Sequence, residues 1–138
     1  MNASPAVERF LKSIYTFQVR NQKVTGTSLS QKLNISPAAI TDMSIKLSKQ
    51  GLINYQKHKR ISLTPKGKKI ALLASRKHRL WETFLLKTLD LNLDEIHIEA
   101  ELIESNTSDF LLEKMDEYLG YPEYDPHGDP IPDKKGLM

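Results

Sequence analysis

The sequence predicts a mainly α-helical fold: an N-terminal winged helix-turn-helix domain with a two-stranded wing, followed by a helical domain. Three observations lead to this prediction. Two short amphipathic segments joined by a tight turn follow a longer helical segment, a basic hairpin follows them, and three capped helical segments come after the hairpin. The expected domains are residues 1–64 and 65–120, with an irregular tail rich in Pro and Gly at 121–138.

The first helix is expected from Ser4 to about Arg20, because Ser4 and Pro5 suit the N-cap and first helical position. A turn around residues 21–25 then leads to a short helix at about 27–33. Ser36 and Pro37 repeat the cap signal and begin a third helix, which continues to about Gln50. The apolar positions that fit two helices crossing over a tight turn are Leu29, Leu33, Ile35, Ile40, Met43, Leu47 and Leu52.

The wing is expected at residues 53–55 and 60–63, where apolar and polar residues alternate on either side of a basic tip, Lys57-His58-Lys59-Arg60. Thr64 and Pro65 then begin a long helix to about Leu89. An Asn92-to-Glu95 capping box opens a helix to about residue 104, and Thr107 or Ser108 opens another to about residue 119.

Charge divides the chain in two. Residues 1–80 hold 16 Lys and Arg against two acids, a net charge of +14, whereas residues 81–138 hold 4 against 15, a net charge of −11. Such a basic segment favours binding to a polyanion, because neutralising phosphates releases condensed counterions. The alternative is a basic surface that is only solvated.

The amino-acid composition excludes several kinds of functional site. Because the chain has no cysteine, disulfides, thiolate zinc sites and cysteine nucleophiles are excluded, and a metal site must use His, Asp and Glu. No apolar run approaches the roughly 20 residues needed to span a bilayer, and the N-terminus lacks the pattern of a signal peptide. We therefore expect a cytoplasmic protein that is not in a membrane.

The second helix of a helix-turn-helix enters the major groove of double-stranded DNA through its N-terminal turns, while basic residues grip phosphate. Small side chains there allow close approach to a thymine methyl group, and Asp42 could accept a hydrogen bond from cytosine or simply be solvated. The predicted DNA-binding residues are Ser36, Pro37, Ala38, Ala39, Thr41, Asp42, Lys46, Lys57, Lys59 and Arg60.

Three segments together resemble a known family of regulators. They are RKHRLWE at 76–82, HIEAE at 97–101 and DPHGDPIP at 125–132. With the order of elements, they are similar to the diphtheria toxin repressor and manganese transport regulator (DtxR/MntR) family, over about residues 7–132. The resemblance implies a homodimeric transcriptional repressor that binds an operator when loaded with iron or manganese, with dimer contacts and metal in the acidic half.

Spacing also supports part of a metal site. His78 and Glu82 lie one turn apart on one helix, as do His97 and Glu101 on another, with Glu104 one turn further. Such nitrogen and oxygen ligands suit Mn, Fe(II) or Zn. On spacing alone, a half-buried histidine and a solvated acidic face remain the preferred alternative. The resemblance assigns His78, Glu82 and His97 to the family's ancillary metal site.

The resemblance fails at the family's primary metal site. The positions on the first helix that offer ligands in the family hold Arg9 and Lys12 here, and the later Glu-x-x-Glu-His pattern becomes Glu101, Glu104 and Ser105. Cations repel a divalent ion, so the primary site is degenerate. We hypothesise that Lys12, with Arg9, pairs with the two glutamates in place of metal, against the alternative that both cations face solvent or DNA. The ion would then be dispensable.

His127 in the tail lies between Asp125 and Asp129 and could contact metal, but a structural or solvent-facing role is preferred.

The sequence leaves other functions open. A metal-independent winged-helix regulator is the main alternative. A small metallohydrolase is disfavoured because the chain lacks an H-E-x-x-H pattern, and an RNA-binding module because the basic half has only four aromatics, mostly at apolar-face positions.

Overall fold

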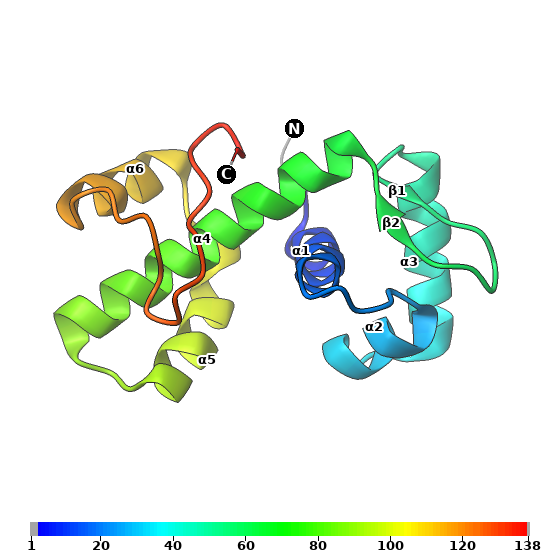
Figure 1. The fold of residues 1–138 in the computed structure, drawn as a ribbon, viewed down its shortest axis with the longest axis horizontal. Helices are drawn as coiled ribbons and strands as arrows, with labels where there is room; N and C mark the ends of the chain where they lie inside the picture. The colour runs from blue at the N-terminus through cyan, green and yellow to red at the C-terminus, as the bar shows by residue number, and fades with distance from the viewer. Residues whose placement is uncertain (1–2, 138) are drawn as a thin grey trace. The chain divides into compact units, whose positions relative to one another are not determined.

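The computed structural model describes residues 3–137, and the chain divides into two compact units, Met1–Ala71 and Leu72–Met138. The division falls inside helix α4 (Pro65–Leu89), a few residues after the boundary expected at residues 64 and 65. The predicted tail belongs to the second unit. Figure 1 shows α1, α2, α3 and the two-stranded hairpin in the first unit, and α5 and α6 in the second.

The first unit contains the predicted helix-turn-helix, formed by α1 (Pro5–Val19), α2 (Gly26–Leu33) and α3 (Pro37–Lys49). Ser4 and Ser36 cap α1 and α3 as predicted, each accepting a hydrogen bond from a backbone N–H three residues on. Helix α2 begins one residue earlier than expected, because Thr25 and Ser28 form a reciprocal capping box. The most deeply buried apolar side chains are Phe10, Leu11, Ile14, Leu29, Ile40 and Leu47.

The wing consists of β1 (Ile53–Asn54) and β2 (Ser62–Leu63), which pair antiparallel with Ile53 opposite Leu63. The paired strands are shorter than the sequence predicted. One reason is that the Ile61 N–H donates instead to the Val24 carbonyl, at 2.9 Å. The returning arm of the wing is thereby attached to the segment between α1 and α2.

The second unit packs α5 (Leu93–Ile103) and α6 (Asp109–Tyr118) against α4. The predicted Asn92–Glu95 capping box opens α5, and Ser108 rather than Thr107 caps α6. Helix α5 ends at Ile103, close to the end expected at about residue 104, and a 3-10 turn follows at Glu104–Asn106. The core of this unit is Leu80, Leu112 and Met115, with Trp81, Phe84, Leu119 and Ile131 packed against it.

The tail has no helix beyond Tyr118 in the described residues, and hydrogen bonds order it. Tyr124 and Pro130 form an isolated antiparallel bridge. Between them, Asp125 Oδ1 accepts from the backbone N–H groups of His127 and Asp129, at 2.9 and 2.8 Å. Arg76, buried on α4, donates to the Pro132 carbonyl at 3.1 Å. The tail is therefore folded back onto α4.

Candidate functional site

One face of α3 is buried and the opposite face is exposed. Ile40, Ser44 and Leu47 point into the first unit. The exposed side holds every α3 residue that the sequence assigned to DNA, namely Ser36, Pro37, Ala38, Ala39, Thr41, Asp42 and Lys46. Thr41 Oγ1 donates to the Pro37 carbonyl at 3.1 Å, which fixes its side chain against its own helix. The helix thus presents small and polar side chains to an approaching duplex.

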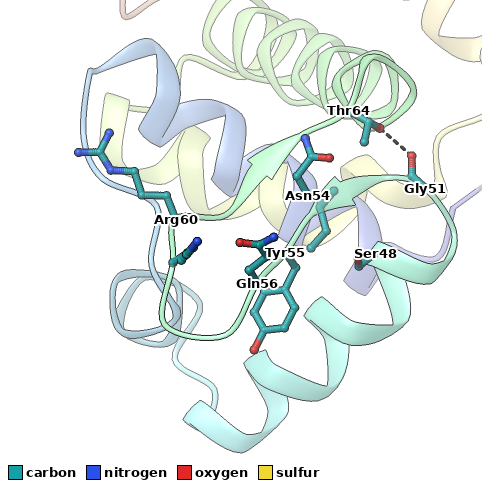
Figure 2. Close-up of a pocket in the computed structure, with 9 residues that line it drawn as sticks. Ser48, Gly51, Asn54, Tyr55, Gln56, Arg60 and Thr64 are labelled. Atoms are coloured by element: carbon teal, nitrogen blue, oxygen red, sulfur yellow. Dashed lines mark hydrogen bonds between the residues drawn. The ribbon is translucent and has the colours of Figure 1, made fainter.

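The wing tip adds cations near this face. Lys57, Lys59 and Arg60 are all exposed, as expected for residues that reach phosphate. A groove of about 600 Å³ lies where the wing meets the end of α3. Figure 2 shows that Tyr55 and Gln56 line it. The sequence reasoning did not single out these two residues, because they lie where the strand gives way to the loop and carry no charge.

The second unit gathers four predicted metal residues on α4 and α5. His78 Nε2 lies 3.3 Å from Glu82 Oε1 one turn along α4. His97 on α5 lies between two carboxylates, with Nδ1 3.5 Å from Glu82 Oε2 and Nε2 3.6 Å from Glu101 Oε1. The rings of His78 and His97 meet edge to face, with centroids 5.0 Å apart. The two helices therefore bring together the residues that the sequence placed on facing helical surfaces.

Glu82 is the centre of this cluster. Its side chain is 2% exposed, and its Oε2 has no hydrogen-bond partner in the part of the chain that the structure describes. Burial alone would raise the pKa of the Glu82 carboxyl, but the hydrogen bond from His78 and the charges of His78, His127 and His97 outweigh burial and lower it. A buried anion with an unsatisfied oxygen is costly unless a cation compensates it.

The tail contributes two further side chains at Glu82. His127 Nδ1 lies 3.6 Å from Glu82 Oε2, and the Asp125 carboxyl is buried. Burial and the nearby charges of Asp129 and Glu82 raise the pKa of Asp125, against backbone hydrogen bonds that lower it. Ligand atoms of Glu82, Asp125 and His127 all lie within 4.8 Å of one another, as do those of His78, His97 and Glu101.

Glu104, the remaining predicted metal residue, contacts His78 from the other side. Its Oε2 lies 2.8 Å from His78 Nδ1, and its side chain is 5% exposed. Arg9 and Lys12 belong to the other compact unit, where Arg9 is exposed and Lys12 partly buried. The ion pairs between these cations and the two glutamates stay a prediction.

Comparison with known families identifies the chain. A model described as the iron-dependent repressor N-terminal DNA-binding domain matches residues 3–61, and one described as the iron-dependent repressor metal-binding and dimerisation domain matches residues 64–133. The chain belongs to the iron-dependent repressor family. The winged-helix fold and the similarity to DtxR and MntR predicted from sequence are thereby confirmed. Members of this family are transcriptional repressors, not enzymes, which removes the metallohydrolase alternative.

Individual relatives support the same family. An HTH-type transcriptional regulator of Methanocaldococcus jannaschii is 35% identical over 113 residues, which cover 81% of this chain and 90% of that protein. The iron-dependent repressor IdeR of Mycobacterium tuberculosis is 27% identical over 125 residues, 91% of this chain and 54% of that protein.

A solved structure of a manganese-dependent transcriptional repressor in complex with manganese superimposes with a TM-score of 0.89 at 39% identity. It covers 95% of this chain and 60% of its own length. The chain thus spans little more than half the length of IdeR and of this structure. Among the described residues, no helix has the length and apolar character to span a membrane.

Proposed function

We propose that this chain acts as a homodimeric repressor that binds a double-stranded DNA operator through α3 and the wing, under the influence of a divalent metal held by His78, Glu82 and His97. The observation that carries the metal part of this proposal is the buried Oε2 of Glu82, which has no hydrogen-bond partner among the described residues and lies 3.5 Å from His97 Nδ1. Mn, Fe(II) or Zn accepts such mixed nitrogen and oxygen donors. When bound, the ion would add positive charge beside the buried Glu82 carboxylate.

The donor groups belong to rigid elements, which favours a preorganised site. His78 and Glu82 lie on α4, and His97 lies one turn into α5, whose capping box fixes its first turn. Glu104 holds the opposite ring nitrogen of His78, a contact that sets the orientation of a ligating imidazole in many metal proteins. Glu101 lies within reach of His97 and offers a further oxygen.

Glu82→Gln tests the metal part of the proposal. The purified, chelator-treated protein is titrated onto DNA from upstream of its own gene, with fluorescence anisotropy at fixed salt, with and without Mn, Fe(II) and Zn. We expect metal to tighten binding at least about tenfold in the wild type and in Glu117→Gln, an exposed control on α6. Glu82→Gln should lose this metal-induced gain in DNA affinity, because its amide cannot replace the carboxylate charge.

The titration without metal distinguishes the proposed function from its main alternative, a regulator that does not depend on metal. Specific and equally tight binding without metal, unchanged by Glu82→Gln, would contradict metal control. It would favour a regulator in which Arg9 and Lys12, at positions where the family offers ligands, replace the ion by pairing with Glu101 and Glu104. Metal-dependent binding would instead assign the switch to the centre at Glu82.

The wing should contribute phosphate contacts that are independent of sequence. Replacing Lys57, Lys59 and Arg60 with Gln is expected to weaken binding to operator and random duplex alike, roughly tenfold or more. It should also reduce the slope of log affinity against log salt by about 0.9 for each phosphate contact removed. Lys87→Gln, which changes an exposed lysine near the end of α4, is the matched control. A variant that keeps the wild-type salt slope would exclude the wing from the phosphate contacts.

A second copy of the chain should cover the exposed apolar side chains of the second unit. Leu102 on α5 is 69% exposed and Phe110 on α6 is 74% exposed, with Ile98 one turn before Leu102 also exposed. This unit matches the dimerisation model of the family. Leu102→Glu is expected to shift sedimentation from dimer towards monomer, because a buried carboxylate is costly. Val19→Glu, which changes an exposed apolar residue of the first unit, should leave the dimer intact.

A further inference from the structure

We propose that Ile45 on α3 is a specificity-determining residue, which reads a thymine of the operator through apolar contact with its C5-methyl group. This inference rests on the proposed binding of double-stranded DNA and adds one base contact to it. Thymine is the base that presents a methyl group in the major groove, so an apolar side chain placed there distinguishes it from the other three bases.

Ile45 is a large apolar side chain left exposed on α3. It is 42% exposed, whereas Ile40 and Leu47 on the other side of the helix are buried. Within α3, all of whose residues the structure describes, it is the one large hydrophobic side chain that is exposed. The core of the first unit is therefore closed without Ile45, and its side chain is accessible to a partner.

The helical period places Ile45 on the face that the sequence assigned to DNA. Ile45 follows Ala38 by seven residues and Asp42 by three, and all three are exposed. These spacings return to the same side of a helix. Seven residues span about 10 Å of helix, and base pairs are stacked about 3.4 Å apart, so Ile45 would reach a different base pair from Ala38.

The charges around Ile45 favour duplex DNA as the partner of this face. Lys46 is the next residue and Lys49 lies one turn further along α3, and both are exposed. The match of residues 3–61 to the family's DNA-binding domain includes this surface. An apolar protein surface laid on Ile45 would desolvate the two ammonium groups without compensation. A duplex pairs them with phosphate while its major groove offers thymine methyl groups.

The test is a double-mutant cycle between Ile45 and single thymine methyl groups. The wild-type protein, with Mn²⁺ present, selects a duplex from a random pool. Each thymine of that duplex is then replaced singly by deoxyuridine, which removes only the methyl group. Fluorescence anisotropy at fixed salt measures the binding of the wild type, of Ile45→Ala and of the control Val19→Ala, which shortens another exposed β-branched residue of the first unit. Ile45→Ala should fold, because alanine favours a helix.

We expect at least one thymine whose replacement weakens binding about fourfold in the wild type and in Val19→Ala, the usual effect of losing one buried methyl group. The same replacement should leave the affinity of Ile45→Ala unchanged. Ile45→Ala should bind the unmodified selected duplex at least about fourfold more weakly than the wild type does. Its affinity for random duplex should equal that of the wild type, because phosphate contacts carry no sequence information.

Three outcomes would contradict the inference. Equal sensitivity of the wild type and Ile45→Ala to deoxyuridine at every thymine would overturn the role of Ile45 but leave the proposed DNA binding standing. Equal weakening of selected and random duplex by Ile45→Ala would show a general effect on the helix and would also overturn that role. If the wild type enriches no sequence from the pool, both this inference and the operator binding of the proposed function fail.

Discussion

Gly67→Ala is expected to unfold the winged-helix unit or to destabilise it by about 3 kcal/mol or more. Gly67 lies in the first turn of α4, and a Cβ added there would lie 1.9 Å from the carbonyl oxygen of Leu52. That oxygen belongs to backbone and already accepts from the Thr64 N–H at 3.1 Å. Relief of the clash therefore requires the start of α4 to move away from the Leu52 backbone, in the turn between α3 and β1.

The same contact positions the DNA-facing surface. Thr64 Oγ1 donates to the Gly51 carbonyl at 2.7 Å, drawn as a dashed line in Figure 2, and accepts from the Gly67 N–H. These bonds connect the cap of α4 with the turn between α3 and β1. We expect Gly67→Ala to lose operator affinity together with stability.

Gly26→Ala is the matched control for this prediction. Gly26 begins α2, and the nearest atom to an added Cβ there, from Ile40, is an ordinary 3.9 Å away. We expect its free energy of unfolding in urea to equal or slightly exceed that of the wild type, because Ala restricts the unfolded chain. Equal stability of Gly67→Ala and Gly26→Ala would show that the close approach to Leu52 does not constrain the fold.

The helices could be predicted because their ends are encoded locally. Ser4-Pro5, Ser36-Pro37 and the Asn92–Glu95 box each satisfy backbone groups within three or four residues, so a cap can be read without knowledge of the fold. The predicted bounds of an element were less accurate where its backbone pairs with a residue far away in the sequence. The β2 strand is shorter than predicted because Ile61 pairs with Val24, which lies 37 residues earlier.

The candidate site could likewise be predicted only where its contacts are local in the sequence. Pairs one turn apart on a helix, such as His78 with Glu82, follow from spacing alone. The approach of His127 to Glu82 spans 45 residues of chain and depends on how the tail folds back. Sequence reasoning considered His127 as a metal contact but preferred a structural or solvent-facing role, since an irregular tail has no periodicity from which its contacts can be inferred. The α3 residues that the sequence assigned to DNA lie on an exposed face because the helical period separates them from Ile40 and Leu47, and their contacts with DNA stay a prediction.

Arg76→Ala is expected to cost the second unit about 3–5 kcal/mol of stability, the usual result of removing one partner of a buried ion pair. The Arg76 side chain is 5% exposed and lies 3.0 Å from Asp116 Oδ2. It also donates to the Pro132 carbonyl at 3.1 Å. Its loss would leave the partly buried Asp116 carboxylate without its cation and would release the tail from α4, so metal affinity at Glu82 should fall as well.

A double variant separates the effect of the unpaired Asp116 charge on stability from the effect of lost packing at Arg76. Arg76→Met with Asp116→Leu removes both charges while keeping apolar volume, and it should recover part of the stability that Arg76→Ala loses, because no unpaired charge remains. Urea unfolding measures both free energies, and titration with Zn²⁺ measures the metal site in the same samples. If Arg76→Ala costs less than about 1 kcal/mol, the pair is no stronger than a surface salt bridge and the tail is held by other contacts. If stability falls but metal affinity does not, the loop reaches Glu82 without help from Arg76.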